Sequence, residues 1–205
     1  MMAAILMASA LATQPLAAAI AAFGEVDAYR ATLHAWSEEA GPQLVRYAWR
    51  RPGFVRMDFI DPHAGAVLVH DPKTGRATLW PFGVGAFPRL DLAPGNRLIR
   101  GSRGHTVDRS DVGVLLASAE RLGRTGKVEV VGEESIDGRR AVHLAVTGAP
   151  GLEVDGVRRY DLWLRIEDLF PLQAESRDPH QRLLETTRLA GLEVGVRFPD
   201  SFFAP

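Results

Sequence analysis

The sequence contains no cysteine among its 205 residues. This absence excludes disulfide bonds, thiolate metal sites, a cysteine nucleophile and a lipid-modified N-terminal cysteine. The chain also has almost no net charge, because 24 Lys and Arg side chains oppose 25 Asp and Glu side chains. Proteins that bind nucleic acid usually present a strongly basic surface, so no nucleic-acid partner is expected.

Recognisable catalytic and metal-binding motifs are missing as well. None of the six histidines has the spacing of a common zinc motif, and there is no Gly-x-Ser-x-Gly segment. The acidic pairs Glu38-Glu39 and Glu133-Glu134 are interpreted as solvated surface, although a carboxylate pair formed by distant residues is invisible in a sequence. The sequence therefore predicts a protein that is not an enzyme, with no catalytic residue, cofactor or metal.

The N-terminal segment lacks charge, since none of the first 22 residues is Asp, Glu, Lys or Arg. An apolar run, then Pro15, then small residues is typical of a secretory signal peptide. Ala17 and Ala19 form an A-x-A motif, which predicts residues 1–22 as a signal peptide cleaved near 19/20 and residues 23–205 as a single domain. Because no Lys or Arg precedes the apolar run, an uncleaved membrane anchor and a buried N-terminal helix are the alternatives.

Alternating side chains between residues 43 and 60 form the most informative pattern in the chain. The apolar side chains predicted to share one face are Val45, Tyr47 and Trp49 before the Pro52-Gly53 break and Val55, Met57 and Phe59 after it. Strict alternation predicts an antiparallel sheet with one solvated face and one apolar face. Arg51 has the same parity as Trp49. It is therefore predicted to project toward the apolar side. A charged side chain there is costly unless it is paired or hydrogen-bonded, so Arg51 is expected to have such a partner or a functional role.

The rest of the chain is predicted to be mainly β, with two helices. One helix is expected over 25–36, where Val26, Tyr29, Leu33 and Trp36 lie at helical spacing. The other begins at the N-cap Asp108, carries the stripe Val112, Leu115, Leu116, Ala119 and Leu122, and ends at Gly123. Nine or ten strands are expected, at 43–51, 54–60, 66–71, 76–82, 127–134, 139–147, 157–166, 170–176 and 182–196.

A sheet of this length is expected to curl. The predicted fold is an unclosed, strongly curved antiparallel β-barrel whose concave face is covered by the helices, with an apolar pocket wherever the two do not fit tightly. Residues 83–106 form a long, glycine-rich connection, a type that is usually functional or mobile. Arg100, Arg103 and Arg109 add positive charge to the loop before the second helix, with solvation as the default interpretation and an anion or headgroup contact as the alternative.

Several segments, in this order, resemble the periplasmic lipoprotein carrier LolA and its relatives, which include the LolB receptor and RseB-type sensors. They are the amphipathic helix expected at 26–36, Trp49-Arg50-Arg51-Pro52, the turn Asp71-Pro72-Lys73-Thr74-Gly75, the strand pair at 160–175 and the ending at 195–203. The resemblance covers most of residues 25–203, and Trp80-Pro81-Phe82 only partly replaces the aromatic strand of that family. It implies an unclosed barrel of about eleven strands with a helical lid.

The resemblance implies a periplasmic carrier that holds acyl chains of lipids or lipoproteins in an apolar cavity, working with inner- and outer-membrane lipoprotein-sorting components. The residues expected to line the cavity are Val45, Tyr47, Trp49, Val55, Met57, Phe59, Leu144, Tyr160, Leu162 and Leu164. Arg51 is expected to act as a latch that hydrogen-bonds the lid, with simple pairing to a nearby carboxylate as the alternative. A lipid sensor or protein-binding scaffold of the same fold, and a hydrolase with an unrecognised site, are the alternatives.

Overall fold

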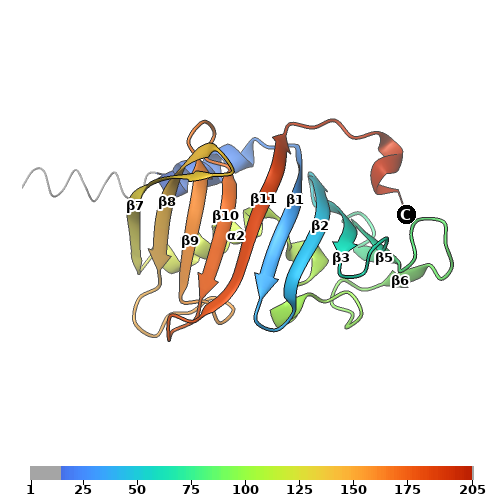
Figure 1. Ribbon diagram of the computed structural model, residues 1–205, viewed down its shortest axis with the longest axis horizontal. Coiled ribbons are helices and arrows are strands. Elements are labelled where there is room, and N and C mark those ends of the chain that lie inside the picture. The colour runs from blue at the N-terminus through green and yellow to red at the C-terminus, as the bar shows by residue number, and fades with distance from the viewer. Residues whose placement is uncertain (1–14, 205) are drawn as a thin grey trace, which may run out of the picture. The chain divides into compact units, whose positions relative to one another are not determined.

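The computed structural model describes residues 15–204, which contain eleven β-strands. Their bounds are β1 Ala28–Ser37, β2 Gly41–Arg50, β3 Phe54–Asp61, β4 Val67–Asp71, β5 Arg76–Trp80, β6 Leu90–Leu92, β7 Lys127–Ile136, β8 Arg139–Thr147, β9 Arg159–Arg165, β10 Pro171–Arg177 and β11 Leu183–Val194. They form one antiparallel sheet in the order β6-β5-β4-β3-β2-β1-β11-β10-β9-β8-β7, which is not closed into a barrel (Figure 1). The predicted class, a mainly β chain with an unclosed antiparallel sheet, is confirmed.

The helical elements are few. α2 spans Val112–Gly123, and a second α-helix covers residues 15–24. Three short 3-10 turns complete the set: η1 Ser102–Gly104, η2 Val107–Arg109 and η3 Asp200–Phe203. Backbone contacts divide the chain into two compact units. Unit 1 comprises the described residues up to Glu25 together with Val112–Thr187, and unit 2 comprises Val26–Asp111 and the residues from Arg188 onward.

In unit 1, α2 covers one face of the sheet. It contacts β7, β8 and β9, and it buries Leu116, Ala119 and Leu122 toward them. The alternation predicted for 157–166 holds, because Leu162 and Leu164 are fully buried on the same face. Burial of large aliphatic side chains between a helix and a sheet is the main source of stability for such a layer.

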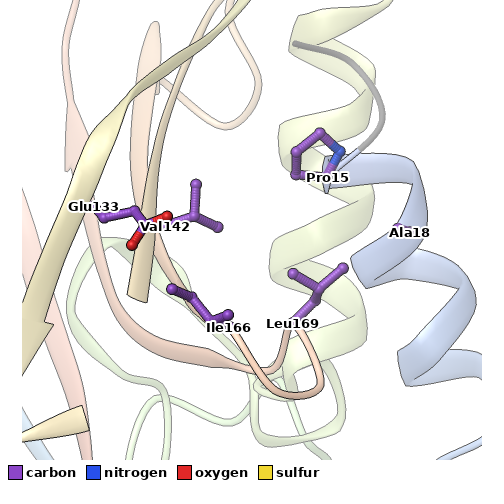
Figure 2. Close-up of a pocket in the computed structure, with 6 residues that line it drawn as sticks. All are labelled: Pro15, Ala18, Glu133, Val142, Ile166 and Leu169. Carbon is purple, nitrogen blue, oxygen red and sulfur yellow. The ribbon is translucent and has the colours of Figure 1, made fainter. Parts of the chain in front are cut away.

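The helix of residues 15–24 lies beside α2 on the same face (Figures 1 and 2). Leu16 and Ala19 are its buried residues. Gly123, the last residue of α2, makes the close packing possible. A Cβ atom there would lie 2.8 Å from a methyl of Val128 and 3.9 Å from one of Leu16, so a larger residue would force the neighbours apart.

In unit 2, strands β1 to β6 are joined in sequence order as antiparallel neighbours. One of its faces carries a hydrophobic cluster that is closed by η3. The buried members are Ala48, Phe54, Val67, Val69, Trp80 and Phe203. Arg56 ties the C-terminal segment to this face, because its guanidinium donates a hydrogen bond of 3.0 Å to the Phe202 carbonyl.

The prediction of a helix over 25–36 is wrong. Residues 28–37 form strand β1, which pairs with β2 along its whole length, with Tyr29 opposite Trp49 and Leu33 opposite Val45. Tyr29 and Leu33 are four residues apart, a spacing that places two side chains on one face of either a helix or a strand. Cross-strand pairing with β2 decides between the two, and it overrides local helical preference.

Two further boundaries differ from the predictions. Asp108 does not cap α2. It lies in the 3-10 turn η2, and α2 begins only at Val112. The connection expected at 83–106 contains β6, a three-residue strand that pairs with β5. Strands β1 and β6 raise the count from the predicted nine or ten to eleven. Most of the predicted signal peptide, residues 1–14, lies outside the described residues.

Candidate functional site

The structure brings the six predicted cavity residues of unit 2 onto one face. Val45 lies opposite Phe59, Tyr47 opposite Met57, and Trp49 opposite Val55 in the β2–β3 register. Val45, Tyr47, Trp49 and Val55 are buried, whereas Met57 and Phe59 are partly exposed. The β2–β3 interpretation of the sequence is therefore confirmed as a shared face, and contact with a ligand stays a prediction.

Aromatic rings fill the middle of this face. Tyr29 from β1 stacks on Tyr47 and Trp49, with ring centroids 5.8 Å and 5.6 Å apart. The Ser110 hydroxyl donates to the Val107 carbonyl at 2.8 Å, so the Tyr47 hydroxyl is the donor across the 3.2 Å contact to Ser110 Oγ. Burial raises the pKa of Tyr47, which keeps the phenol neutral. This cluster is a packed aromatic wall rather than a reactive centre.

The four predicted residues of unit 1 also share one face. Leu144 lies opposite Leu162, in the β8–β9 register that also aligns Tyr160 and Leu164 with the same side. Leu144, Leu162 and Leu164 have no exposed surface, and Tyr160 is partly exposed. They form the filled core beneath α2. Whether any of them touches a ligand stays a prediction.

An apolar pocket of about 330 Å³ lies at the end of this face in unit 1 (Figure 2). Its lining residues are Pro15, Ala18, Glu133, Val142, Ile166 and Leu169. The helix of residues 15–24 forms one wall, and the ends of β7 and β8 with the β9–β10 turn form the other. The volume is at the lower end of the range of small-molecule sites, about 300–1,000 Å³. The pocket is largely open to solvent rather than enclosed.

The single charged group in the pocket lining is neutralised at its rim. The carboxylate of Glu133 accepts a hydrogen bond of 2.6 Å from the guanidinium of Arg140, and both side chains are mostly exposed. The other described lining residues, Pro15, Ala18, Val142, Ile166 and Leu169, are apolar. A mostly aliphatic lining with one polar group is the arrangement expected for an amphiphilic ligand, which has an apolar chain and a polar headgroup.

None of the ten predicted cavity residues lines this pocket, although the sequence contained a usable signal. Ile166 continues the alternating series of Tyr160, Leu162 and Leu164 toward the end of β9, and Val142 lies opposite Leu164. Pro15 and Ala18 were not recognisable, because they belong to a segment whose composition predicts a signal peptide.

Arg51 follows the last residue of β2 and holds the segment that leads from the helix of residues 15–24 into β1. Its guanidinium donates a hydrogen bond of 3.0 Å to the Val26 carbonyl and lies 3.9 Å from the Asp27 carboxylate. Its backbone N–H also binds the Asp27 carbonyl at 2.8 Å. The guanidinium lies 5.9 Å from the centre of the Trp49 ring, close to the apolar face as the parity predicted.

We predict that Arg51→Leu speeds the release of a bound acyl probe. The substitution removes the hydrogen bond to Val26, and because the Arg51 side chain is 47% exposed, the loss should be only about 0.5–1.5 kcal/mol, or roughly two- to tenfold in rate. Stopped-flow fluorescence with an excess of unlabelled fatty acid measures this rate. Arg46→Leu, which removes an exposed arginine from the preceding strand β2, is the control. Equal release from both variants and the wild type would contradict a latch.

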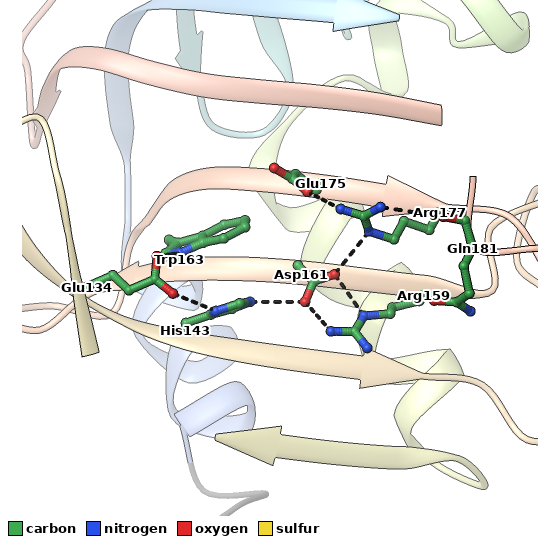
Figure 3. Close-up of polar contacts among 8 residues, drawn as sticks. All are labelled: Glu134, His143, Arg159, Asp161, Trp163, Glu175, Arg177 and Gln181. Carbon is green, nitrogen blue, oxygen red and sulfur yellow. Dashed lines mark hydrogen bonds and ion pairs between the residues drawn. The ribbon is translucent and has the colours of Figure 1, made fainter. Parts of the chain in front are cut away.

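The opposite face of unit 1 carries a network of charged side chains centred on Asp161 (Figure 3). The side chain of Asp161 is 5% exposed and accepts two hydrogen bonds from Arg159, of 2.8 Å and 2.7 Å. His143 Nε2 lies 3.0 Å from the same carboxylate, and Arg177 Nε lies 3.7 Å from it. Three cations or donors from β8, β9 and β10 therefore converge on one buried acid.

A second carboxylate extends the network to β7. Glu134 lies 2.9 Å from His143 Nδ1 and accepts a hydrogen bond of 3.0 Å from Trp163 Nε1. The His143 ring stacks on Trp163 with centroids 4.3 Å apart. Carboxylates only accept hydrogen bonds, so the contacts to Glu134 and Asp161 are both made when both ring nitrogens of His143 carry protons. The sequence predicted Glu134 as a solvated surface acid, whereas the structure shows it in contact with His143 and Trp163.

Hydrogen bonding keeps both acids ionised. Burial alone would raise the pKa of Asp161, but hydrogen bonds from Arg159 and His143 outweigh it, so the pKa lies below its ordinary value. Hydrogen bonds from Trp163 and His143 likewise lower the pKa of Glu134. Because each of these groups contacts another member, the network joins the four strands β7, β8, β9 and β10.

Residues 15–204 contain no cluster of three or more His, Asp or Glu side chains arranged to hold a metal ion. No helix in the same part of the chain is long and apolar enough to span a membrane.

Comparisons with known proteins identify the fold. No protein-family model and no curated protein matches the chain. A chain of the Pseudomonas aeruginosa MucA/MucB complex aligns with a TM-score of 0.57 and 20% identity, over 95% of this chain and 60% of that one. The Mycobacterium tuberculosis lipoprotein LppX aligns with a TM-score of 0.57 and 10% identity, over 92% and 97%. An uncharacterized conserved protein from Thermus thermophilus aligns with a TM-score of 0.55 and 11% identity, over 93% and 90%.

At these identities the likeness shows the fold alone. The fold is LolA-like, as the order of segments in the sequence predicted. The chain spans 60% of the length of the matching chain in the MucA/MucB complex, which therefore has a part without counterpart here.

Proposed function

We propose that this protein binds a hydrocarbon chain, such as an acyl chain of a lipid or lipoprotein, and carries it in the envelope. The observation that supports this most is the apolar pocket of unit 1, walled by the helix of residues 15–24. Binding needs no catalytic group, because each methylene removed from water contributes about 0.8 kcal/mol. A chain of six to eight buried methylenes would thus supply about 5–6 kcal/mol before the cost of association.

The helix of residues 15–24 is the part of the pocket best suited to move. It reaches the rest of the chain through the connector at Val26 and Asp27, which Arg51 binds. Its own anchors are Leu16, Ala19 and a ring contact of 6.1 Å between Phe23 and Phe170. A helix that packs on a sheet without joining its strand pairing can move without breaking that pairing.

The proposal has a consequence for processing of the N-terminus. Cleavage near 19/20 would remove Pro15 and Ala18 from the pocket. Carriage in this pocket therefore requires that Pro15 and Ala18 stay on the chain, which is incompatible with the predicted cleavage near 19/20. The intact mass of the exported protein decides between the two.

Mass spectrometry of lipid extracted from the purified protein tests the proposal. We expect co-purified lipid with saturated or monounsaturated chains, and displacement of a fluorescent fatty acid by the same lipid. A protein that carries no lipid after gentle purification, and that does not bind the fluorescent fatty acid at micromolar concentration, would exclude the carrier function.

A second candidate function, binding of a protein partner, rests on a different observation. Strand β7 stands at one end of the sheet order, and it exposes Val130 and Val131 next to a register shift at Gly132. An exposed edge strand can accept a strand from another chain. The MucA/MucB complex, whose fold is related, makes this class of function worth testing. Photo-crosslinking from position 131 in cells would capture such a partner, and a partner bound to the lipid-free protein would favour this function over carriage.

A further inference from the structure

The connection between β5 and β6 exposes large apolar side chains in unit 2. Phe87 is 92% exposed, Phe82 is 73% exposed and Val84 is 57% exposed. Pro81 to Pro88, the segment that contains them, is called here the apolar loop, and it extends away from β5 and β6 (Figure 1). Single exposed apolar residues are ordinary, but three within six positions of one loop form a patch that needs an explanation.

The exposure of Phe82 and Phe87 does not arise because unit 2 is unable to bury aromatic side chains near the loop. Trp80, the residue immediately before the apolar loop, is buried in the hydrophobic cluster closed by Phe203. The chain therefore buries one aromatic ring at the end of β5 and presents the next two to solvent. Gly83 and Gly85 have φ values of 100° and 86°, which few other residues adopt, and they turn the backbone so that the loop doubles back. The two glycines therefore give the loop a defined backbone conformation that leaves its apolar side chains exposed.

We propose that the apolar loop is a membrane-contact element, which inserts Phe82, Val84 and Phe87 into the interface of a lipid bilayer. Between Pro81 and Pro88 no side chain is charged or able to hydrogen-bond. A protein partner is usually recognised by apolar anchors surrounded by polar groups, whereas a bilayer requires only apolar side chains at the correct height. The composition of the loop therefore matches the lipid surface.

The residues at the base of the loop suit the headgroup region. Arg89 is exposed, and its guanidinium lies 5.7 Å from the centre of the Trp80 ring. The acid nearest to it in sequence, Asp91, is already paired with Arg76 at 3.2 Å. The charge of Arg89 at the base of the loop is thus positive. Anionic phospholipid should therefore bind somewhat better than zwitterionic phospholipid.

The loop can enter the interface only shallowly. Within it the Ala86 N–H binds the Gly83 carbonyl at 3.0 Å, and the Gly83 N–H reaches the Trp80 carbonyl at 3.5 Å. The other peptide groups of an irregular loop need water or headgroups as partners, so they cannot lie in the hydrocarbon core. The side chains, and not the backbone, are expected to reach the acyl region. This contact would place the protein on a membrane, and it stands independently of whether unit 1 holds an acyl chain.

The absence of cysteine permits a direct test with the full chain. Phe87→Cys and Leu98→Cys are each labelled with an environment-sensitive fluorophore; Leu98 is also exposed, but it follows β6, and the chain enters and leaves that strand at opposite ends. With vesicles of equal parts phosphatidylethanolamine and phosphatidylglycerol, we expect a blue shift and increased emission at position 87 and little change at position 98. Equal signals at both positions, or none at 87, would overturn the proposal.

Flotation of unlabelled protein supplies the second arm. We expect Phe82→Ser with Phe87→Ser to reduce the vesicle-bound fraction by at least about tenfold, while Leu98→Ser leaves it unchanged. Thermal unfolding and fatty-acid binding in vesicle-free solution should be unaffected, which separates failure of this proposal from failure of the carrier function. If the double variant floats like the wild type, or if the loop instead holds two copies together in sedimentation, the membrane contact is wrong.

Discussion

Replacing Asp161 by alanine is expected to lower the free energy of unfolding by about 2–4 kcal/mol. The substitution leaves Arg159, Arg177 and His143 converging on a space that no longer contains a negative charge. Breaking a buried ion pair by removing one partner typically costs about 3–5 kcal/mol. The expected loss is somewhat smaller here, because both arginine side chains are roughly one-third exposed and can recover some hydration.

Urea unfolding monitored by circular dichroism measures this loss. Glu193→Ala is the matched control, because Glu193 forms a bidentate pair with Arg30 in which both side chains are largely exposed. Exposed pairs contribute little because water and salt screen them, so the control should shift the midpoint little. If Asp161→Ala lowers the free energy of unfolding no more than Glu193→Ala does, hydration of the arginines compensates for the missing carboxylate and the prediction is wrong.

The same carboxylate makes stability depend on pH. The pKa of Asp161 is lower in the folded protein than its ordinary value of about 3.9, so the unfolded chain binds the proton more readily. The contribution of Asp161 is therefore complete above about pH 5 and is lost as the pH falls through the folded pKa. The pKa of Glu134 is lowered in the same direction. Asp161→Asn should be less stable than the wild type at pH 7, and the difference should shrink toward pH 3.

The strands could be predicted from the sequence wherever one face is apolar and the other is polar. Tyr160, Leu162 and Leu164 alternate with Arg159, Asp161 and Trp163, and the structure separates them onto the two faces as expected. Strand β1 could not be predicted in this way, because Tyr29 and Leu33 satisfy both the helical and the extended period. Only the partner strand β2 removes that ambiguity, and the pairing is invisible in the local pattern.

The candidate site was harder to predict than the fold, because it joins segments that are far apart in sequence. Ala18 lines the same pocket as Val142 and Leu169 only after the sheet has formed. The network on the other face has the same character, since His143 lies 9 positions from Glu134 and 18 from Asp161. Alternation assigns each side chain to a face, but it gives neither the partner on the next strand nor the place where packing leaves a gap.

Filling the pocket of unit 1 should have a large effect on binding: Ala18→Phe is expected to weaken acyl-chain binding by about 15- to 60-fold. Ala18 is an exposed residue of the helix of residues 15–24 and lines the pocket, so a larger side chain there fills the space without disturbing the core. A ring that displaces two or three methylenes of the ligand removes about 1.6–2.4 kcal/mol, at about 0.8 kcal/mol for each methylene. Titration with a fluorescent fatty acid measures the change.

Ala17→Phe provides the matched control, because Ala17 is exposed on the same helix but does not line the pocket. This variant should bind as the wild type does, which excludes a general effect of an added aromatic ring. Chain length supplies a further readout, since a partly filled pocket should discriminate against long acyl chains more than against short ones. Loss of binding that is equal for all chain lengths would indicate damage to the fold. Unchanged binding by a stable Ala18→Phe protein would move the acyl site away from this pocket, and the buried faces that carry Tyr47 and Leu162 would then be the places to search.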